Sequence, residues 1–127
     1  MGRLIGGNLW SIADLCGMPC MPEIRQGDIM FIEDTETWAD GLENFLAKLK
    51  ICGIFDKIGG LIISKCRGDV DCETEKTYYD FIYDYIGRPD YPVLAEFDFS
   101  HNAPMLTMPI GIMAELDADA KAIRLVR

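Results

Sequence analysis

Histidine, positive charge and long apolar runs are all scarce in this sequence. One of the 127 residues, His101, is a histidine, and 12 lysines and arginines face 21 aspartates and glutamates, which gives a formal net charge of −9. Nucleic-acid binding and binding to an anionic membrane surface both depend on clustered positive charge, so this balance argues against both partners. No apolar run reaches the roughly 18 residues that a bilayer-spanning helix needs. Met1 leads into GRLIGG without the apolar stretch of a signal peptide, and we therefore expect a cytoplasmic protein.

The cysteines lack the spacing of a metal site. The sequence holds no CxxC pair and no CxxxH pair, and a single histidine adds little to a ligand set. An odd number of cysteines also does not suggest a disulfide framework. We expect reduced thiols that pack as small apolar side chains, with no metal and no other cofactor. The five are Cys16, Cys20, Cys52, Cys66 and Cys72.

The hydrophobic pattern predicts a single α/β domain over residues 1–127. Half of the residues are hydrophobic, and a chain of this length can bury a sizeable core. Apolar residues recur at helical spacing in three segments. The first follows Asn8, a good N-cap; the second runs from Thr37, a candidate cap, to Gly53; and the third ends at Gly87.

Short apolar segments between these helices predict strands. We interpret Gly6-Gly7-Asn8 as a turn that ends the first strand, and the last three strand patterns as an antiparallel sheet joined by a hairpin turn at 117–119. Together with the helices, this favours a mixed sheet that is barrel-like or layered. The predicted strands cover residues 3–5, 28–33, 59–64, 92–99, 108–118 and 121–127.

His101, in FDFSHNAPM, is the candidate for chemistry. Its neighbour Ser100 points to the opposite side of an extended chain, and neither Ser11 nor Ser64 lies in a G-x-S-x-G turn, so no complete Ser-His-acid set is visible. Glu33 ends an apolar strand, where a carboxylate needs a hydrogen-bond donor. An imidazole suits it, because the carboxylate would fix the tautomer and leave the other ring nitrogen as a base. The alternative is an ordinary surface or packing histidine.

Five segments follow one another along the chain in a recognisable order: GRLIGGNL, MPEIRQGDIMFIED, LKICGIFDKIGGLIISK, YPVLAEFDFSH and PMLTMPIG. Together they resemble the C-terminal half of the LD-carboxypeptidase family of serine peptidases, and its microcin self-immunity branch most closely. The likeness extends from Gly2 to the final strand. It implies a C-terminal swivelling β/β/α-type domain with about three helices. It also implies an N-terminal partner domain, carrying the nucleophilic serine and the oxyanion hole, that is absent from this chain.

The resemblance also implies roles for individual residues. Glu33 matches the family's triad glutamate and His101 its triad histidine, so His101 is expected to act as general base and Glu33 as the acid that orients it. Two positions depart from the family pattern. Ser100 stands where many members have glycine, and Gly41 where some have an arginine, which puts some substrate contacts in doubt and leaves the triad positions unchanged.

Two further positions are candidates for substrate binding. Asn8 would line the cleft between the domains, although a turn and a helix cap also explain it. Lys65, like Arg67, could meet a substrate carboxylate, although a solvated loop also explains both.

We therefore expect a domain that supplies Glu33 and His101 to a hydrolase and is inactive alone. The intact enzyme, by resemblance a homodimer, would cleave amide bonds in muropeptide tails with an L,D linkage or in microcin-type peptidyl-nucleotides. The alternative is a non-catalytic binding or interaction module that retains the fold.

Overall fold

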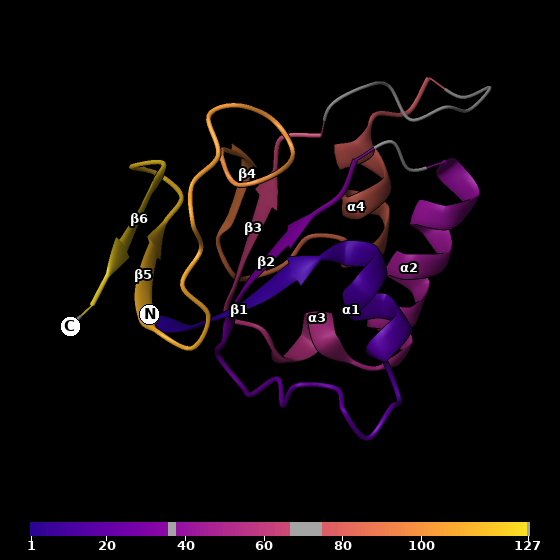
Figure 1. The fold of residues 1–127 in the computed structure, drawn as a ribbon, viewed down its shortest axis with the longest axis horizontal. Coiled ribbons are helices and arrows are strands. Elements are labelled where there is room, and N and C mark those ends of the chain that lie inside the picture. Colours follow the sequence, from indigo (N-terminus) through magenta and orange to yellow (C-terminus); the bar gives the residue numbers. More distant parts are fainter. Residues whose placement is uncertain (36–37, 67–74, 127) are drawn as a thin grey trace.

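A computed structural model describes residues 1–35, 38–66 and 75–126, which form a mixed sheet of six strands with four helices (Figure 1). The α/β prediction is confirmed. Three of the helices are those that the sequence predicts, and the fourth, α3, is a single turn between two of the predicted elements. In chain order the elements are β1 (Gly2–Asn8), α1 (Leu9–Leu15), β2 (Ile29–Glu33), α2 (Ala39–Ile51), α3 (Ile54–Lys57), β3 (Gly60–Ser64), α4 (Tyr78–Ile86), β4 (Val93–Phe97), β5 (Met113–Asp117) and β6 (Ala122–Leu125).

The strand order is β4-β3-β2-β1-β5-β6. The strands β1 to β4 run parallel, whereas β5 pairs antiparallel with β1, and β6 pairs antiparallel with β5. Among the described residues the sheet is open, with β4 and β6 at its edges, rather than closed into a barrel. The prediction that β4 joins an antiparallel sheet was wrong. Helix α4 connects β3 to β4, and a helical crossover returns the chain in the parallel direction.

The helix boundaries follow local capping. The Asn8 side chain accepts a hydrogen bond from the Ser11 backbone N–H, as an N-cap should. Helix α4 begins with a capping box between Thr77 and Asp80. Helix α2 has Trp38 at its N-cap position, and Thr37, the predicted cap, lies outside the described residues.

The first strand is longer than the sequence suggests, because Gly6 and Gly7 do not form a turn. Both lie within β1, with φ angles of 153° and 151°. A Cβ atom at Gly6 would lie 1.9 Å from the backbone oxygen of Phe31 on β2. Glycine is therefore needed here for close approach of two strands, and the strand continues to Asn8.

Two apolar cores cover the two faces of the sheet. On one face, Ile32 and Ile63 pack with the helices, which lie together on one side in Figure 1. On the other face, Phe31 and Ile62 pack with residues of β5 and of the segment after β4, including Phe99. This second core supports the loop that carries the single histidine.

Candidate active site

Two functional candidates meet where the parallel strands β1 and β2 end. The last residues of these strands, Asn8 and Glu33, are partners in the parallel register, so their side chains leave the sheet side by side. The Asn8 amide donates a hydrogen bond to Glu33 Oε1 at 3.1 Å, while its Oδ1 accepts from the backbone N–H of Ser11 at 3.0 Å. Asn8 is thus both a helix cap and a partner of the carboxylate.

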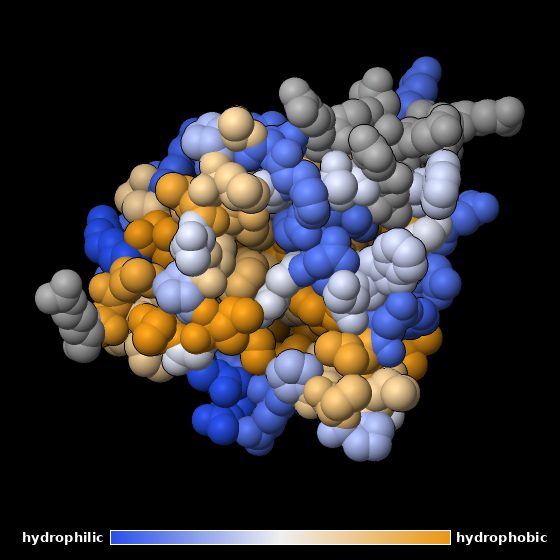
Figure 2. Space-filling model, viewed as in Figure 1, coloured by the Kyte–Doolittle hydropathy of each residue, from blue (hydrophilic) through white to orange (hydrophobic). Residues whose placement is uncertain are grey.

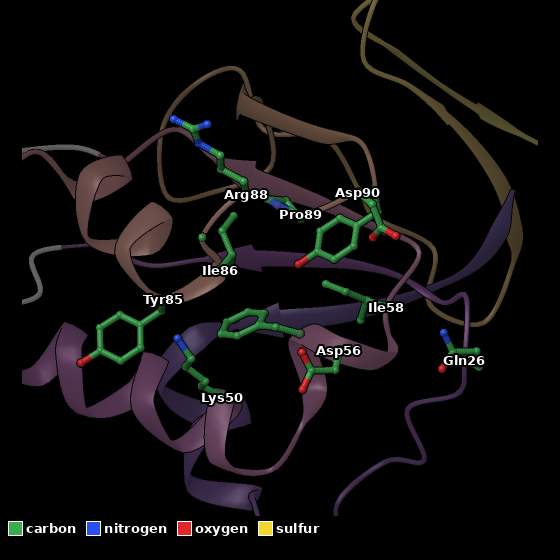
Figure 3. A pocket seen from close by; sticks show the side chains of 12 residues that line it. Gln26, Lys50, Asp56, Ile58, Tyr85, Ile86, Arg88, Pro89 and Asp90 are labelled. Carbon is green, nitrogen blue, oxygen red and sulfur yellow. The ribbon is translucent and has the colours of Figure 1, made fainter.

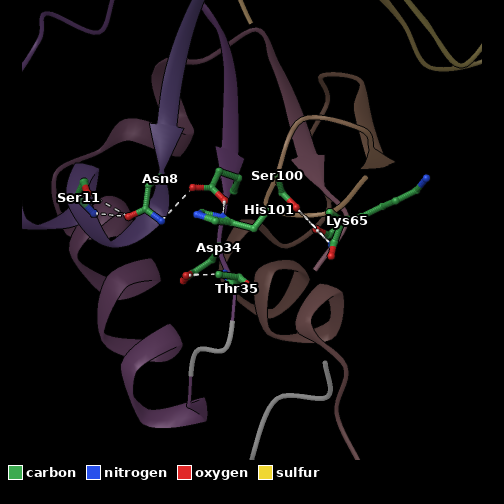
Figure 4. Close-up of polar contacts among 9 residues, drawn as sticks. Asn8, Ser11, Asp34, Thr35, Lys65, Ser100 and His101 are labelled. Carbon is green, nitrogen blue, oxygen red and sulfur yellow. Dashed lines mark hydrogen bonds and ion pairs between the residues drawn. The ribbon is translucent and has the colours of Figure 1, made fainter. Parts of the chain in front are cut away.

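His101 completes this cluster from a distant part of the chain. Its Nδ1 lies 3.0 Å from Glu33 Oε2, so both oxygens of the carboxylate have a partner (Figure 4). The Glu33 side chain is 12% exposed and the His101 side chain 62%. A neutral imidazole that donates Nδ1–H to a carboxylate keeps an electron pair on Nε2. The arrangement can therefore offer an oriented base to a substrate.

A bulge in β4 leads the chain towards Glu33. The register between β3 and β4 shifts between Ile62 and Ser64, and Glu96 adopts a φ of 58° there. Bulges of this kind redirect a strand and its side chains, often beside active sites. Five residues after Glu96, His101 reaches the ends of β1 and β2.

The histidine loop is tied to the chain just after β3. Ser100, which is buried, donates a hydrogen bond to the Lys65 carbonyl at 2.6 Å, and Asn102 donates to the same oxygen at 3.1 Å. The Lys65 ammonium pairs with Asp98. Sequence reasoning missed this role for Ser100 and Asn102, although their places on either side of His101 are a signal for it.

The serines of the chain do not complete a triad with His101. The Ser100 hydroxyl is bonded to a carbonyl, the Ser11 hydroxyl donates to Asn8 Oδ1 at 3.0 Å, and Ser64 is fully buried in β3. The structure thus supplies a base and an acid. It pairs neither with a nucleophilic serine of this chain.

The nearby thiol of Cys66 is also unsuited to replace the nucleophile. Burial, together with the charges of Asp34 and Glu33, raises its pKa to about 11. Burial and the same two carboxylates raise the pKa of Tyr78 well above its usual value. A thiol with so high a pKa is protonated near neutral pH, and the thiolate is the nucleophilic form.

Glu33 and His101 line a shallow cavity of about 270 Å³. Asn8 lines it too, and its walls are largely apolar, with Phe31 and Phe99 among them. An apolar wall lowers the local dielectric, which strengthens interactions with charge that develops at the base. The cavity therefore has the character of one side of an active-site cleft.

A larger cavity of about 540 Å³ lies elsewhere and contains none of the predicted site residues. Lys50 of α2 and Asp56 of α3 face it, with Tyr85 of α4 (Figure 3). Its charges are mixed, and no base-acid pair like that of the smaller cavity is present among its described lining residues. Chemistry rather than size thus favours the smaller cavity as the active site.

The described residues contain neither a metal-ligand cluster nor a membrane-spanning helix. Within residues 1–35, 38–66 and 75–126, no group of three or more histidine, cysteine or acidic side chains is placed to hold a metal ion. In the described part of the chain, no helix has the length and apolar character for crossing a bilayer.

Comparison with known proteins assigns the chain to a family. Residues 1–116 match the model of the LD-carboxypeptidase C-terminal domain. The microcin C7 self-immunity protein MccF of Escherichia coli is 39% identical over 123 residues, covering 96% of this chain and 36% of that protein. The probable murein peptide carboxypeptidase of Bacillus subtilis is 29% identical over 122 residues, covering 94% of this chain and 38% of that protein.

Solved structures agree. MccF in complex with glutamyl sulfamoyl guanosine matches with a TM-score of 0.90 at 36% identity, over 99% of this chain and 38% of that one. The muramoyltetrapeptide carboxypeptidase from Oxalobacter formigenes matches with a TM-score of 0.79 at 30% identity, over 98% of this chain and 44% of that one. The chain thus spans less than half the length of these relatives. It belongs to the LD-carboxypeptidase family and corresponds to the C-terminal domain of that family.

Proposed function

We propose that this chain is the part of a serine-type carboxypeptidase that supplies the general base, His101, and the acid that orients it, Glu33. The observation that carries the proposal is the 3.0 Å contact between His101 Nδ1 and Glu33 Oε2, with the imidazole exposed and the carboxylate nearly buried. A buried carboxylate holding an exposed imidazole is the base-acid half of a catalytic triad.

In this mechanism Nε2 of His101 takes the proton of a serine hydroxyl as its oxygen attacks the amide carbonyl. Glu33 stabilises the imidazolium that forms, and the imidazolium then gives its proton to the leaving amine. Water hydrolyses the acyl-enzyme with the same base, which restores the serine. Asn8 fixes the second carboxylate oxygen, so Glu33 keeps its position while the charge of its partner changes.

The nucleophile in this proposal comes from a domain outside this chain. Two observations support that division: relatives are more than twice as long as the matched region, and none of the chain's three serines is bonded to His101. One matched MccF structure is an active-site variant in which a serine, an asparagine and a lysine are replaced by alanine. That variant is in keeping with a serine and an asparagine acting together in a relative.

For the substrate, we propose an amide bond near a free carboxylate. Among the relatives, MccF has been solved with glutamyl sulfamoyl guanosine and with aspartyl sulfamoyl adenosine, and others are murein peptide or muramoyltetrapeptide carboxypeptidases. The corresponding substrates are microcin-type peptidyl-nucleotides and muropeptide tails with an L,D linkage. Lys65 is the proposed contact for the substrate carboxylate, because its ammonium is partly exposed beside the histidine loop. Such substrates would place the enzyme in the cytoplasm.

An exposed apolar surface beside the cavity is proposed to receive the missing domain and to support a homodimer of the intact enzyme. Figure 2 shows apolar side chains gathered on the side of the molecule where Figure 1 places the β4–β5 connection and β5. Exposed apolar area of this extent commonly marks an interaction surface. Light scattering of the isolated chain at high concentration should show self-association; a monomer would count against this part of the proposal. The exposed residues are Met105, Leu106, Ile110, Ile112 and Met113.

The proposal is tested by assaying amide hydrolysis with and without the upstream coding region of the gene. The isolated chain should show no turnover on a muropeptide or a peptidyl-nucleotide. The longer protein should be active, and Glu33→Gln in it should lose about a hundredfold or more in kcat, because an amide cannot stabilise the imidazolium. Turnover by the isolated chain would contradict the divided triad. A longer protein without activity, or a gene without an upstream serine-bearing domain, would favour the binding module instead.

A further inference from the structure

A pair of cysteines lies at the end of the molecule opposite the active site. Cys16 is the C-cap residue of α1, and Cys52 is the C-cap residue of α2. The two helices each follow a parallel strand and pack against each other. Their carboxyl ends therefore lie together, 36 residues apart in sequence and adjacent in space (Figure 1).

The two cysteines are neighbours. Both line the same cavity of about 240 Å³ at the ends of the helices, and Cys52 is close enough to influence the ionisation of Cys16. The Cys16 sulfur also lies 3.6 Å from the carbonyl oxygen of Ile12, one helical turn earlier. The packing of α1 on α2 and the shared cavity make the two cysteines neighbours, and proximity is the first requirement for a disulfide.

The surroundings of the two sulfurs differ. Cys52 is exposed to solvent, whereas Cys16 is half-buried. Burial, followed by the influence of the neighbouring Cys52 sulfur, raises the pKa of Cys16 to about 11. An oxidant in solution therefore reaches Cys52 first. Cys16, like Cys66, is mostly protonated near neutral pH, so it resolves the product slowly, through its minor thiolate form, and is not suited to rapid catalysis.

We propose that Cys16 and Cys52 are a site of reversible oxidation, at which a hydroperoxide produces an intramolecular disulfide that links α1 to α2. The Cys52 thiolate attacks the peroxide oxygen, the O–O bond breaks, and a sulfenic acid and an alcohol, or water, are formed. The Cys16 sulfur then attacks the sulfenic sulfur, the S–O bond breaks, and water leaves with the thiol proton. In total two thiols are oxidised, and one peroxide is reduced to an alcohol and water.

The disulfide would close a loop that contains all of β2 and the start and body of α2. Closing a loop of this length in the unfolded chain raises the stability of the folded state. The Glu33–His101 contact lies at the other end of the same strands, so the link should form without disturbing it. This inference is independent of the proposed catalytic role.

The test is peroxide treatment of the purified chain. After exposure to hydrogen peroxide and blocking of remaining thiols, two of the five thiols should be lost, and non-reducing peptide mapping should identify one peptide linked through Cys16 and Cys52. The melting temperature should rise by about 5–10 °C, and dithiothreitol should reverse both changes. Gel filtration should show that the linked species is not a larger oligomer.

Matched variants separate this pair from the other thiols. Cys52→Ser changes an exposed position and should abolish the linked peptide and the rise in melting temperature. Cys20→Ser, also at an exposed position, should leave both unchanged. The proposal is overturned if the treated protein keeps Cys16 and Cys52 as free thiols, if Cys52 is oxidised only to sulfinic acid, or if the disulfide joins Cys20 or a second copy of the chain.

Discussion

Two polar pairs sit at opposite ends of the same two strands. At the amino ends of β1 and β2, Arg3 forms an ion pair with Asp28, with Nη2 to Oδ2 at 2.7 Å and Nε to Oδ1 at 3.2 Å. At the carboxyl ends, Glu33 contacts His101 at 3.0 Å. The distances are similar and the exposures are not: the Arg3 side chain is 24% exposed, whereas the His101 side chain is 62% exposed.

The two pairs differ in what surrounds them, and this separates a structural pair from the pair that we propose to be catalytic. Asp28 has its oxygens occupied by Arg3 and by the backbone N–H of Arg25, and Arg3 also donates to the Glu23 carbonyl. That pair also borders a cavity, of about 290 Å³, but both Asp28 oxygens already accept hydrogen bonds and the carboxylate is buried, so the pair offers little to a ligand. In the other pair the acid is held as firmly, yet the imidazole faces a cavity, at the strand ends where open α/β sheets commonly bind ligands.

The largest expected effect comes from removing the exposed base. In the intact enzyme, His101→Gln should lower kcat by about a thousandfold or more, because no other group can take the serine proton. The free energy of unfolding of the chain should change by less than about 0.5 kcal/mol, because the side chain is largely exposed. Steady-state kinetics and urea unfolding measure the two quantities.

Activity and stability of His101→Gln together distinguish a catalytic residue from a structural one. A variant with full activity would remove His101 from the mechanism, and a variant that unfolds easily would make it a structural residue. Asp28→Asn, at the other end of β2, is the control that should show the reverse pattern of unchanged activity and lower stability.

The second largest effect is expected from breaking the Arg3–Asp28 pair, and the resulting loss in the free energy of unfolding should depend on pH. Burial by itself would raise the pKa of Asp28, but hydrogen bonds from Arg3 and from the Arg25 backbone more than offset it, so the pKa lies below its usual value. A lowered pKa means that the pair stabilises the fold above the unfolded-state pKa of about 3.9 and loses this contribution as pH falls through the folded-state value.

Asp28→Asn should therefore lower the free energy of unfolding by about 2 kcal/mol at pH 7, because it leaves the Arg3 charge without its partner. Below pH of about 4 the difference between wild type and variant should shrink. Urea unfolding at several pH values measures this. An equal difference at every pH would mean that the carboxylate charge is not what stabilises the pair.

Asn8 has a structural role, because it caps helix α1, and a place in the candidate site, because it donates a hydrogen bond to Glu33. Asn8→Ala should lower the free energy of unfolding by about 1 kcal/mol through loss of the cap. In the intact enzyme it should also lower kcat by about tenfold, because Glu33 loses one of its two partners. Thr77→Ala removes the cap of α4 and is the matched control. It should destabilise by a similar amount without lowering kcat, and an equal activity loss in both variants would reduce Asn8 to a cap.

Much of this arrangement could be predicted from local patterns. Asn8 and Gly53 mark the ends of helices, and the apolar runs mark β2 and β3, because caps and periodicity depend on near neighbours. The direction of β4 could not be predicted from local patterns. It runs parallel to β3 because helix α4 connects the two strands and returns the chain in the same direction. Gly6 was misread for a related reason: its need for glycine comes from the Phe31 carbonyl on another strand.

In the candidate site, too, some features could be predicted from the sequence and others depend on contacts between distant segments. Glu33 and His101 stand out by residue type and by family resemblance, and the structure brings them together. The loop that delivers His101 depends on a bulge at Glu96 and on hydrogen bonds from Ser100 and Asn102 to the Lys65 carbonyl. These contacts join segments more than 30 residues apart in sequence, and no local pattern encodes them.

The smallest effect is expected at Lys65, whose ammonium pairs with Asp98 and points away from His101 in Figure 4. Both side chains are about a third or more exposed, so Lys65→Met should change the free energy of unfolding by less than about 0.5 kcal/mol. The backbone carbonyl that holds the histidine loop stays in place. If the ammonium meets a substrate carboxylate, KM should rise about three- to fivefold while kcat is unchanged.

Asp98→Asn separates this contact from the ion pair itself. It breaks the pair as Lys65→Met does but leaves the cation in place, now free to meet an anionic substrate, so KM should stay the same or fall. Equal rises in KM for both variants would mean that the pair only holds the loop, and unchanged KM in both would remove Lys65 from substrate binding. Breaking the Arg3–Asp28 pair should therefore lower the stability of the fold, whereas removing the Lys65 cation should raise KM.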